Sequence, residues 1–150
     1  MEILIVEDDE NKRMQTSGFI KDLVADVRID TANALQSGLR KIIGGYFDLI
    51  ILDMSMPTFD IDLHEDGGRM QAYAGREILW QMERREIEIP VVVLTQFDVF
   101  GKGDDALTLR ELDETLRTTH SNIYKGSVYY DVAMGTWKDK LRNAIQDLIK

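Results

Sequence analysis

The sequence predicts an α/β fold, a doubly wound parallel sheet of five strands with helices on both faces. Runs of apolar residues alternate along the chain with segments of helical periodicity, which is the pattern of repeated βαβ units. Two of these runs, Leu49–Leu52 and Val91–Leu94, are apolar at every position, as in strands covered on both faces. At 150 residues the chain is long enough to bury its own core, and we expect a single domain, 1–150.

Composition and charge narrow the possible functions. Hydrophobic residues make up 44% and charged residues 30% of the chain, a profile typical of globular proteins, and no apolar run is long enough to span a bilayer. The net charge of −9 and the dispersed Lys and Arg disfavour direct nucleic-acid binding. Because Met1–Val6 enters a strand pattern without a basic leader, we expect a cytoplasmic protein with no membrane partner. The absence of Cys excludes disulfides, thiol catalysis and cysteine metal sites.

Each element is predicted from its own pattern of apolar residues and boundary signals. Thr31 is the expected N-cap of the second helix, which Gly44 ends. The expected strands are Ile3–Val6, Val27–Ile29, Leu49–Leu52, Val91–Leu94 and a segment within Ile123–Tyr130. The expected helices are Asn11–Val24, Thr31–Ile43, Gly75–Arg85, a helix running through Leu107 to Leu116, and Thr136–Lys150.

Two connections are longer than a parallel sheet requires. One is a loop insertion at about 58–73, and the other is an enlarged connection at about 97–122. Asp60 and Asp62 begin the spacing of a calcium loop, but Glu65 stands where such a loop needs Gly. We therefore favour an acidic, solvated loop that contacts a partner over a calcium site.

Polar side chains follow three of the apolar strands. Glu7 and Asp8 follow the first, Asp53 follows the third and Thr95 ends the fourth. The carboxyl ends of parallel strands share one edge of the sheet, so we expect these residues to converge there. Crowded carboxylates repel one another unless one takes up a proton or a hard cation such as Mg²⁺ neutralises them. A Mg²⁺ with few protein ligands keeps positions open for phosphate oxygens, which suits phosphoryl transfer.

These motifs resemble those of two-component response-regulator receiver domains. An apolar strand followed by two acidic residues is matched by Val6–Asp8. A central strand that ends in the phosphoacceptor Asp, with Met-Pro three and four residues later, is matched by Asp53 and Met56–Pro57. A fourth strand that follows a Pro and ends in Thr or Ser is matched by Pro90–Thr95. The resemblance implies the flavodoxin-like receiver fold, with strand order 2-1-3-4-5.

The resemblance also implies a role for each matched residue. Asp53 is the expected phosphoacceptor for a histidine kinase or phosphotransfer protein. Asp8 and Asp53 are expected to bind Mg²⁺ with the backbone carbonyl of Ser55, while Glu7 acts mainly through water. Thr95 is expected to bind the phosphoryl group and to move as the switch.

The sequence departs from the family pattern in three places. Receivers carry a Lys at the end of the fifth strand, and Lys125 is the nearest candidate for this phosphoryl-binding role. If the strand is instead Ser127–Tyr130, the Lys is missing from its end. With Lys125 in this role, the position of the switch aromatic, three residues earlier, is occupied by Asn122, and Gln96 stands where a small residue is usual.

The first interpretation is a stand-alone receiver that signals by phosphorylation-dependent protein–protein contact. Its expected partners are a kinase or phosphotransfer protein and a downstream output protein, with a homodimer possible. It is not a conventional enzyme, and its chemistry is at most Mg²⁺-dependent self-phosphorylation and self-dephosphorylation. The alternative is a receiver-like interaction module that binds its partner without phosphorylation. A phosphatase is disfavoured because Ser55 cannot act as a general acid, and a flavin carrier because acidic residues follow the first strand.

Overall fold

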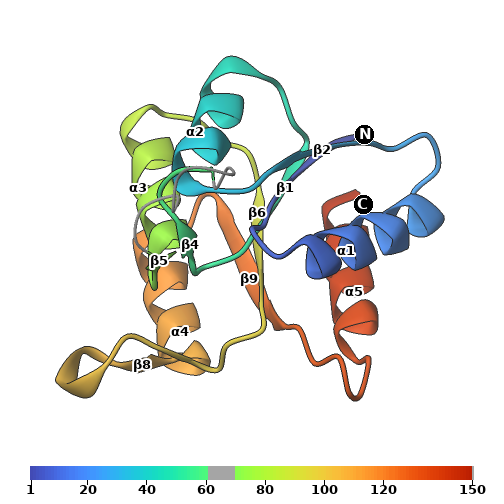
Figure 1. Cartoon of the computed structure of the whole chain (residues 1–150). Coiled ribbons are helices and arrows are strands. Elements are labelled where there is room, and N and C mark those ends of the chain that lie inside the picture. Colours follow the sequence, from blue (N-terminus) through green and yellow to red (C-terminus); the bar gives the residue numbers. More distant parts are fainter. Residues whose placement is uncertain (61–69, 150) are drawn as a thin grey trace.

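The fold is organised around one parallel sheet at the centre of the molecule (Figure 1). The structure, a computed structural model, describes residues 1–60 and 70–149. Five strands pair in the order β2-β1-β3-β6-β9, and all four pairings are parallel. Without the short strands elsewhere in the chain this is the order 2-1-3-4-5, so the predicted topology is confirmed. The strands are β1 (Glu2–Val6), β2 (Arg28–Ala32), β3 (Leu49–Leu52), β6 (Val91–Thr95) and β9 (Tyr124–Tyr129).

Helices cover both faces of this sheet because neighbouring strand residues point to opposite sides. In β1, Ile3 belongs to the core beneath α1 (Glu10–Leu23) and α5 (Trp137–Ile149). The next residue, Leu4, belongs to the core beneath α2 (Leu35–Gly44), α3 (Ala74–Arg84) and α4 (Leu109–Thr119). Figure 1 shows α1 and α5 together on one side of the sheet and α2, α3 and α4 on the other. The continuous apolar strands therefore have the double coverage that their sequence predicts.

Two predicted boundaries are wrong. Thr31 was expected to cap the second helix, but it lies in β2, paired with Ile5, and the helix begins after Ala34. The Ser37 hydroxyl accepts a hydrogen bond from the Ala34 amide at 3.2 Å, so a side chain inside the helix replaces the expected cap. Leu107 was expected in a helix but lies in a short strand, and Thr108 caps α4 with its side chain.

Short antiparallel pairs stand in both long connections. Within the first, β4 (Met56–Pro57) pairs with β5 (Met70–Gln71). Most of the predicted insertion at 58–73 lies outside the described residues, as do Asp62 and Glu65 of the calcium-loop test. Within the second, β7 (Val99–Phe100) pairs with β8 (Leu107–Thr108) around the short helix η1 (Gly103–Asp105). The enlarged connection at 97–122 thus holds this hairpin and α4.

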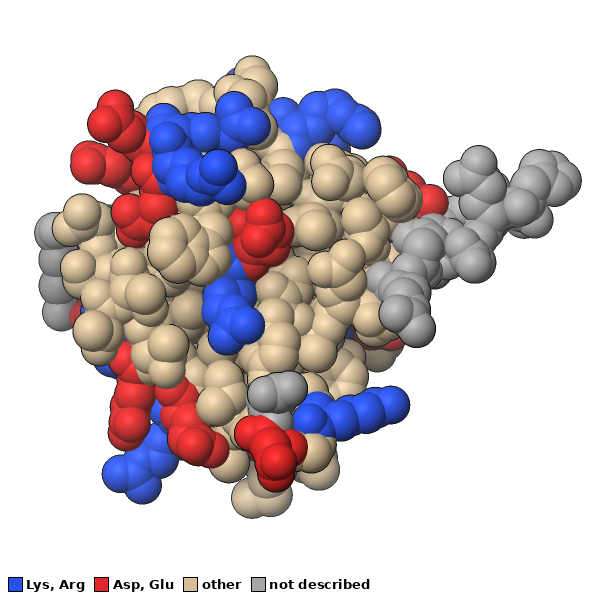
Figure 2. Space-filling model, turned by 90° about the vertical axis from the view of Figure 1, so that its left-hand side faces the viewer, with Lys and Arg blue, Asp and Glu red and all other residues tan. Residues whose placement is uncertain are grey.

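The surface over α2, α3 and α4 carries charges of both signs. Figure 2 shows Lys and Arg in separate groups on this face, among acidic and uncharged side chains. This face therefore has no continuous basic patch among its described residues. None of the helices in the described ranges combines the length and apolar character needed to cross a bilayer.

Candidate functional site: an acidic cluster at the carboxyl edge of the sheet

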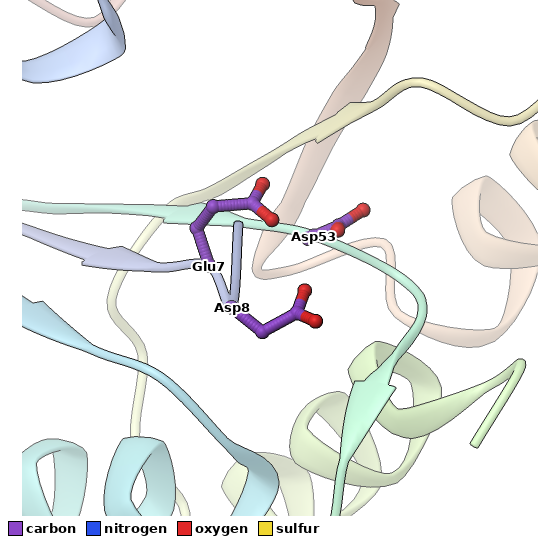
Figure 3. A group of neighbouring side chains, drawn as sticks. All are labelled: Glu7, Asp8 and Asp53. Carbon is purple, nitrogen blue, oxygen red and sulfur yellow. The ribbon is translucent and has the colours of Figure 1, made fainter. Parts of the chain in front are cut away.

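The register of the sheet brings the predicted acidic residues together. Val6 of β1 pairs with Leu52 of β3, so Glu7 and Asp53 follow paired positions on neighbouring strands. The Asp53 amide donates to the carbonyl of Val6 at 3.0 Å, which holds the two strand ends side by side. Figure 3 shows Glu7 and Asp8 leaving the end of β1 and Asp53 leaving the end of β3, with their carboxylates around one space. The predicted convergence is confirmed for these three residues.

The three carboxylates form a cluster that could hold a metal ion. One oxygen from each of Glu7, Asp8 and Asp53 lies within 4.8 Å of the other two. Asp53 is 1% exposed, and its Oδ2 is a buried acceptor without a hydrogen-bond partner in the described part of the chain. Its Oδ1 accepts from the Met54 amide at 2.8 Å. An unpaired buried carboxylate oxygen beside two further carboxylates is a donor set that fits a hard cation such as Mg²⁺.

Burial and mutual repulsion raise the pKa of the neighbouring acids. Burial, followed by the charge of Asp53, raises the pKa of Glu7 from its ordinary 4.5 to about 8, although contacts with Lys12 oppose this rise. The same two causes, in the same order, raise the pKa of Asp8. The site therefore favours whatever relieves its excess negative charge, whether a proton or a cation.

A lysine that the sequence analysis did not single out lies inside the site. Lys12, on α1, is 1% exposed, and its Nζ forms an ion pair with Glu7 and lies 3.4 Å from Asp53 Oδ1. The same nitrogen donates to the carbonyl of Leu94 at 2.7 Å and to Gln96 Oε1 at 2.9 Å. Residues 12, 16 and 20 share one helical face, and Lys12, Thr16 and Ile20 are the buried residues of α1, but two of the three are polar, so the apolar pattern of the sequence did not mark this face as buried.

The turn between β1 and α1 fixes where Lys12 points. Asp9 caps the helix, and its side chain accepts from the Lys12 amide at 2.8 Å. The Asp9 amide in turn donates to Glu7 Oε2 at 3.1 Å. Both Glu7 oxygens thus have partners within the same short segment, one in Lys12 and one in the Asp9 amide.

Thr95 and Ser55 lie near the same edge. Thr95 is fully buried at the end of β6, and its Oγ1 accepts from the Phe97 amide at 3.2 Å, which leaves the hydroxyl proton available for an acceptor. Ser55 follows Asp53 by two residues, and its hydroxyl donates to the carbonyl of Ala72 at 2.9 Å. The predicted role of the Ser55 carbonyl as a metal ligand stays a prediction.

Lys125 does not lie at this site. It is an exposed residue near the amino end of β9, just after Tyr124, which pairs with Val91 at the start of β6. The carboxyl end of β9 is instead Tyr129, opposite Thr95. The predicted phosphoryl-binding role of Lys125 is therefore incompatible with this register, because the strand begins near Lys125 rather than ending there. The alternative prediction, in which no Lys stands at the strand end, describes the structure.

Comparison with known proteins identifies relatives along nearly the whole chain. A family model for the response regulator receiver domain matches residues 3–114. The uncharacterized protein y4jR of Sinorhizobium fredii is 32% identical over 146 residues, which cover 96% of this chain and 96% of that protein. The Detocs response regulatory protein DtcB of Enterobacter cloacae is 29% identical over 150 residues, 99% of this chain and 100% of DtcB.

Solved structures share the fold. The response regulator protein TrrA from Thermotoga maritima, in complex with Mg(2+)-BeF, has a TM-score of 0.63 at 20% identity and covers 98% of this chain and 97% of its own. A CheY-like response regulator receiver domain protein from Methanospirillum hungatei has a TM-score of 0.64 at 18% identity, over 98% of this chain and 92% of its own. At such identities the likeness shows the fold alone, whereas the family model spans most of the sequence. The chain belongs to the response regulator receiver domain family.

Proposed function

We propose that this receiver is a phosphorylation-controlled switch that accepts a phosphoryl group on Asp53 from a histidine kinase or phosphotransfer protein. The observation that carries the proposal is the state of the Asp53 carboxylate. It is buried, one of its oxygens has no hydrogen-bond partner among the described residues, and two other carboxylates lie beside it. Such an oxygen is costly unless it serves a cation or a reaction.

The donor set suits Mg²⁺. Asp8 and Asp53 would bind the ion together with the backbone carbonyl of Ser55. Glu7 would act mainly through water, because both of its oxygens already have partners in Lys12 and in the Asp9 amide. When bound, Mg²⁺ neutralises the carboxylates and the oxygens of the incoming phosphoryl group.

In the transfer, one bond to phosphorus forms and another breaks. An oxygen of Asp53 forms an O–P bond as the P–N bond of the phosphohistidine breaks, and the released electron pair stays on the imidazole nitrogen, which takes a proton from water. Thr95, with its hydroxyl proton available, then donates to a phosphoryl oxygen.

The signal would leave by contact with a downstream protein. The similarity to DtcB, a response regulatory protein, over 99% of this chain supports a regulatory role. A second candidate is a module that binds its partner without phosphorylation. One observation favours it, namely that Lys12 already pairs with Glu7 and approaches Asp53 without any phosphoryl group.

Treatment with acetyl phosphate separates these candidates. We expect the intact mass of the purified chain to increase by one phosphoryl group only when Mg²⁺ is present. Asp53→Asn should abolish the increase, while Asp22→Asn, at an exposed position on α1, should keep it. An unmodified wild-type protein that also fails to bind Mg²⁺ would leave the second candidate. Mg²⁺ binding without modification would call for a kinase as donor before the switch is rejected.

A further inference from the structure

The site contains a buried cation whose presence helix packing does not explain. Lys12 takes a position on the inner face of α1 that it shares with Thr16 and Ile20. A Lys is almost never fully buried unless it is paired, because removing an ammonium from water is costly. An apolar side chain would fill the same space without that cost. The ammonium at this position therefore serves the carboxylates around it.

The contacts of Lys12 show what it is placed to do. An ammonium has three N–H donors, and Glu7, the Leu94 carbonyl and Gln96 are its three close acceptors. Asp53 Oδ1 lies slightly farther away, at 3.4 Å. Two of the close acceptors are a charged group and a backbone carbonyl, which hold the nitrogen in place. The third is the side-chain amide of Gln96, which is partly exposed and can turn to water, so this contact costs least to exchange.

The charges of the cluster leave room for Lys12 beside a metal ion. Three carboxylates face one ammonium, so the ionised cluster has a formal charge of −2, which one Mg²⁺ balances. A phosphoryl group on Asp53 adds negative charge again and brings three strong acceptor oxygens. Arg13 also reaches this region, but its guanidinium donates to the backbone carbonyl of Glu7 at 3.0 Å and forms no ion pair with the three acids among the described contacts.

We infer that Lys12 of α1 is the cationic residue that binds the phosphoryl group on Asp53, exchanging its Gln96 contact for a phosphoryl oxygen while Glu7 and the Leu94 carbonyl keep it in place. This inference rests on the proposed phosphorylation of Asp53. Lys12 stabilises charge on the phosphoryl oxygens, and because its position comes from α1, the end of β9 needs no Lys.

Lys12→Met tests the inference, with Lys21→Met as the matched control at an exposed position on the same helix. With Mg²⁺ and saturating acetyl phosphate, Lys12→Met should be phosphorylated roughly a hundredfold more slowly than wild type, as when one preorganised charge-stabilising donor is lost. The loss should fall on the maximal rate rather than on the donor concentration at half-maximal rate. Lys12→Arg, which keeps the charge, should recover part of the rate, and Lys21→Met should match wild type.

A thermal melt provides a readout that does not depend on phosphorylation. Beryllofluoride, which mimics a phosphoryl group on a carboxylate, should raise the melting temperature of the Mg²⁺-bound wild type further. Lys12→Met should keep the increase due to Mg²⁺ and lose the increase due to beryllofluoride. A variant that folded poorly would lose both, and Lys12→Arg would then decide, since it should regain the beryllofluoride increase.

Three outcomes would overturn the inference, and they can be told apart. Wild-type rates in Lys12→Met would show that Lys12 does not act on the phosphoryl group. Faster phosphorylation of Lys12→Met would show that Lys12 obstructs the site. A wild-type protein that takes up neither a phosphoryl group nor beryllofluoride would reject the proposed function together with the role of Lys12.

Discussion

Glu7 should make the stability of this protein depend on pH when Mg²⁺ is absent. Its side chain is buried, and burial followed by the charge of Asp53 raises its pKa from 4.5 to about 8. The other groups that face it are Asp8 on the same turn, Lys12 on α1 and Tyr130 after β9. Between these two pKa values the folded protein holds a proton that the unfolded chain has lost. The stabilisation is therefore complete below the unfolded pKa and disappears as the pH rises through the folded pKa.

The expected change in stability follows from the linkage between proton binding and folding. One retained proton changes the free energy of unfolding by about 1.4 kcal/mol per pH unit. The protein should therefore lose about 2 kcal/mol of stability between pH 6 and pH 8, and at pH 8 Glu7 is half titrated. For a chain of 150 residues this corresponds to a fall in melting temperature of about 4–8 °C. Glu7→Gln, which is uncharged at every pH, should lack this part of the fall. Thermal melts in EDTA at pH 6, 7 and 8 would measure it, with the exposed Glu10→Gln as control.

Mg²⁺ should oppose this fall in stability with rising pH. The metal competes with the proton for the cluster, so the increase in melting temperature produced by a fixed Mg²⁺ concentration should grow from pH 6 to pH 8 in wild type. The growth should be smaller in Glu7→Gln. Parallel stability curves for wild type and Glu7→Gln across this range in EDTA would refute the reasoning, because they would show that Glu7 binds no more protons in the folded than in the unfolded chain between pH 6 and pH 8.

Two further predictions concern the support of the site and the end of a helix. A Cβ added at Gly75 would lie 2.7 Å from the carbonyl oxygen of Asp53, so Gly75→Ala should destabilise the fold by roughly 1–3 kcal/mol and weaken Mg²⁺ binding. Gly18→Ala, on α1 with nothing within 4 Å of its added Cβ, should instead stabilise by about 0.5–1 kcal/mol; equal melting temperatures for these two variants would contradict the clash. Thr108→Ala removes the side chain that caps α4 and should cost about 1 kcal/mol in a denaturant melt, and an unchanged midpoint would show that the cap contributes nothing.

The central sheet was predictable because its strands carry strong local signals. Leu49–Leu52 and Val91–Leu94 are apolar at every position, and their short length and β-branched content favour strands covered on both faces of a sheet over helices. The short hairpin strands carry no comparable signal, since two residues such as Val99 and Phe100 define no period. Thr31 was misplaced because Thr is favoured both at helix N-caps and in strands. In the structure Thr31 pairs with Ile5, which places it in β2.

The acidic part of the site was predictable for a different reason. A carboxylate directly after a buried strand can only lie at one edge of a parallel sheet, so Glu7 and Asp53 were placed by their strands. The position of the lysine in the site was not predictable in this way. Lys125 stands near the correct strand but at its amino end, and the strand end could not be fixed from Ser127–Tyr130 alone. Lys12 looked like an ordinary helix residue until the orientation of α1 showed which face is buried.

The position of Lys12 links helix formation to the chemistry of the site. The Asp9 side chain that caps α1 accepts the amide of Lys12, and the Asp9 amide binds the same Glu7 carboxylate that pairs with the Lys12 ammonium. One short turn therefore sets the start of the helix, the orientation of one acid and the place of the counter-charge. A lysine on a strand end depends on the register of that strand, whereas Lys12 depends only on where α1 begins. The last strand therefore ends in Tyr129 without a Lys, and the ring centroid of the buried Tyr130 that follows it lies 5.7 Å from the Lys12 Nζ, so the exchange of partners by Lys12 on phosphorylation would take place beside the end of β9.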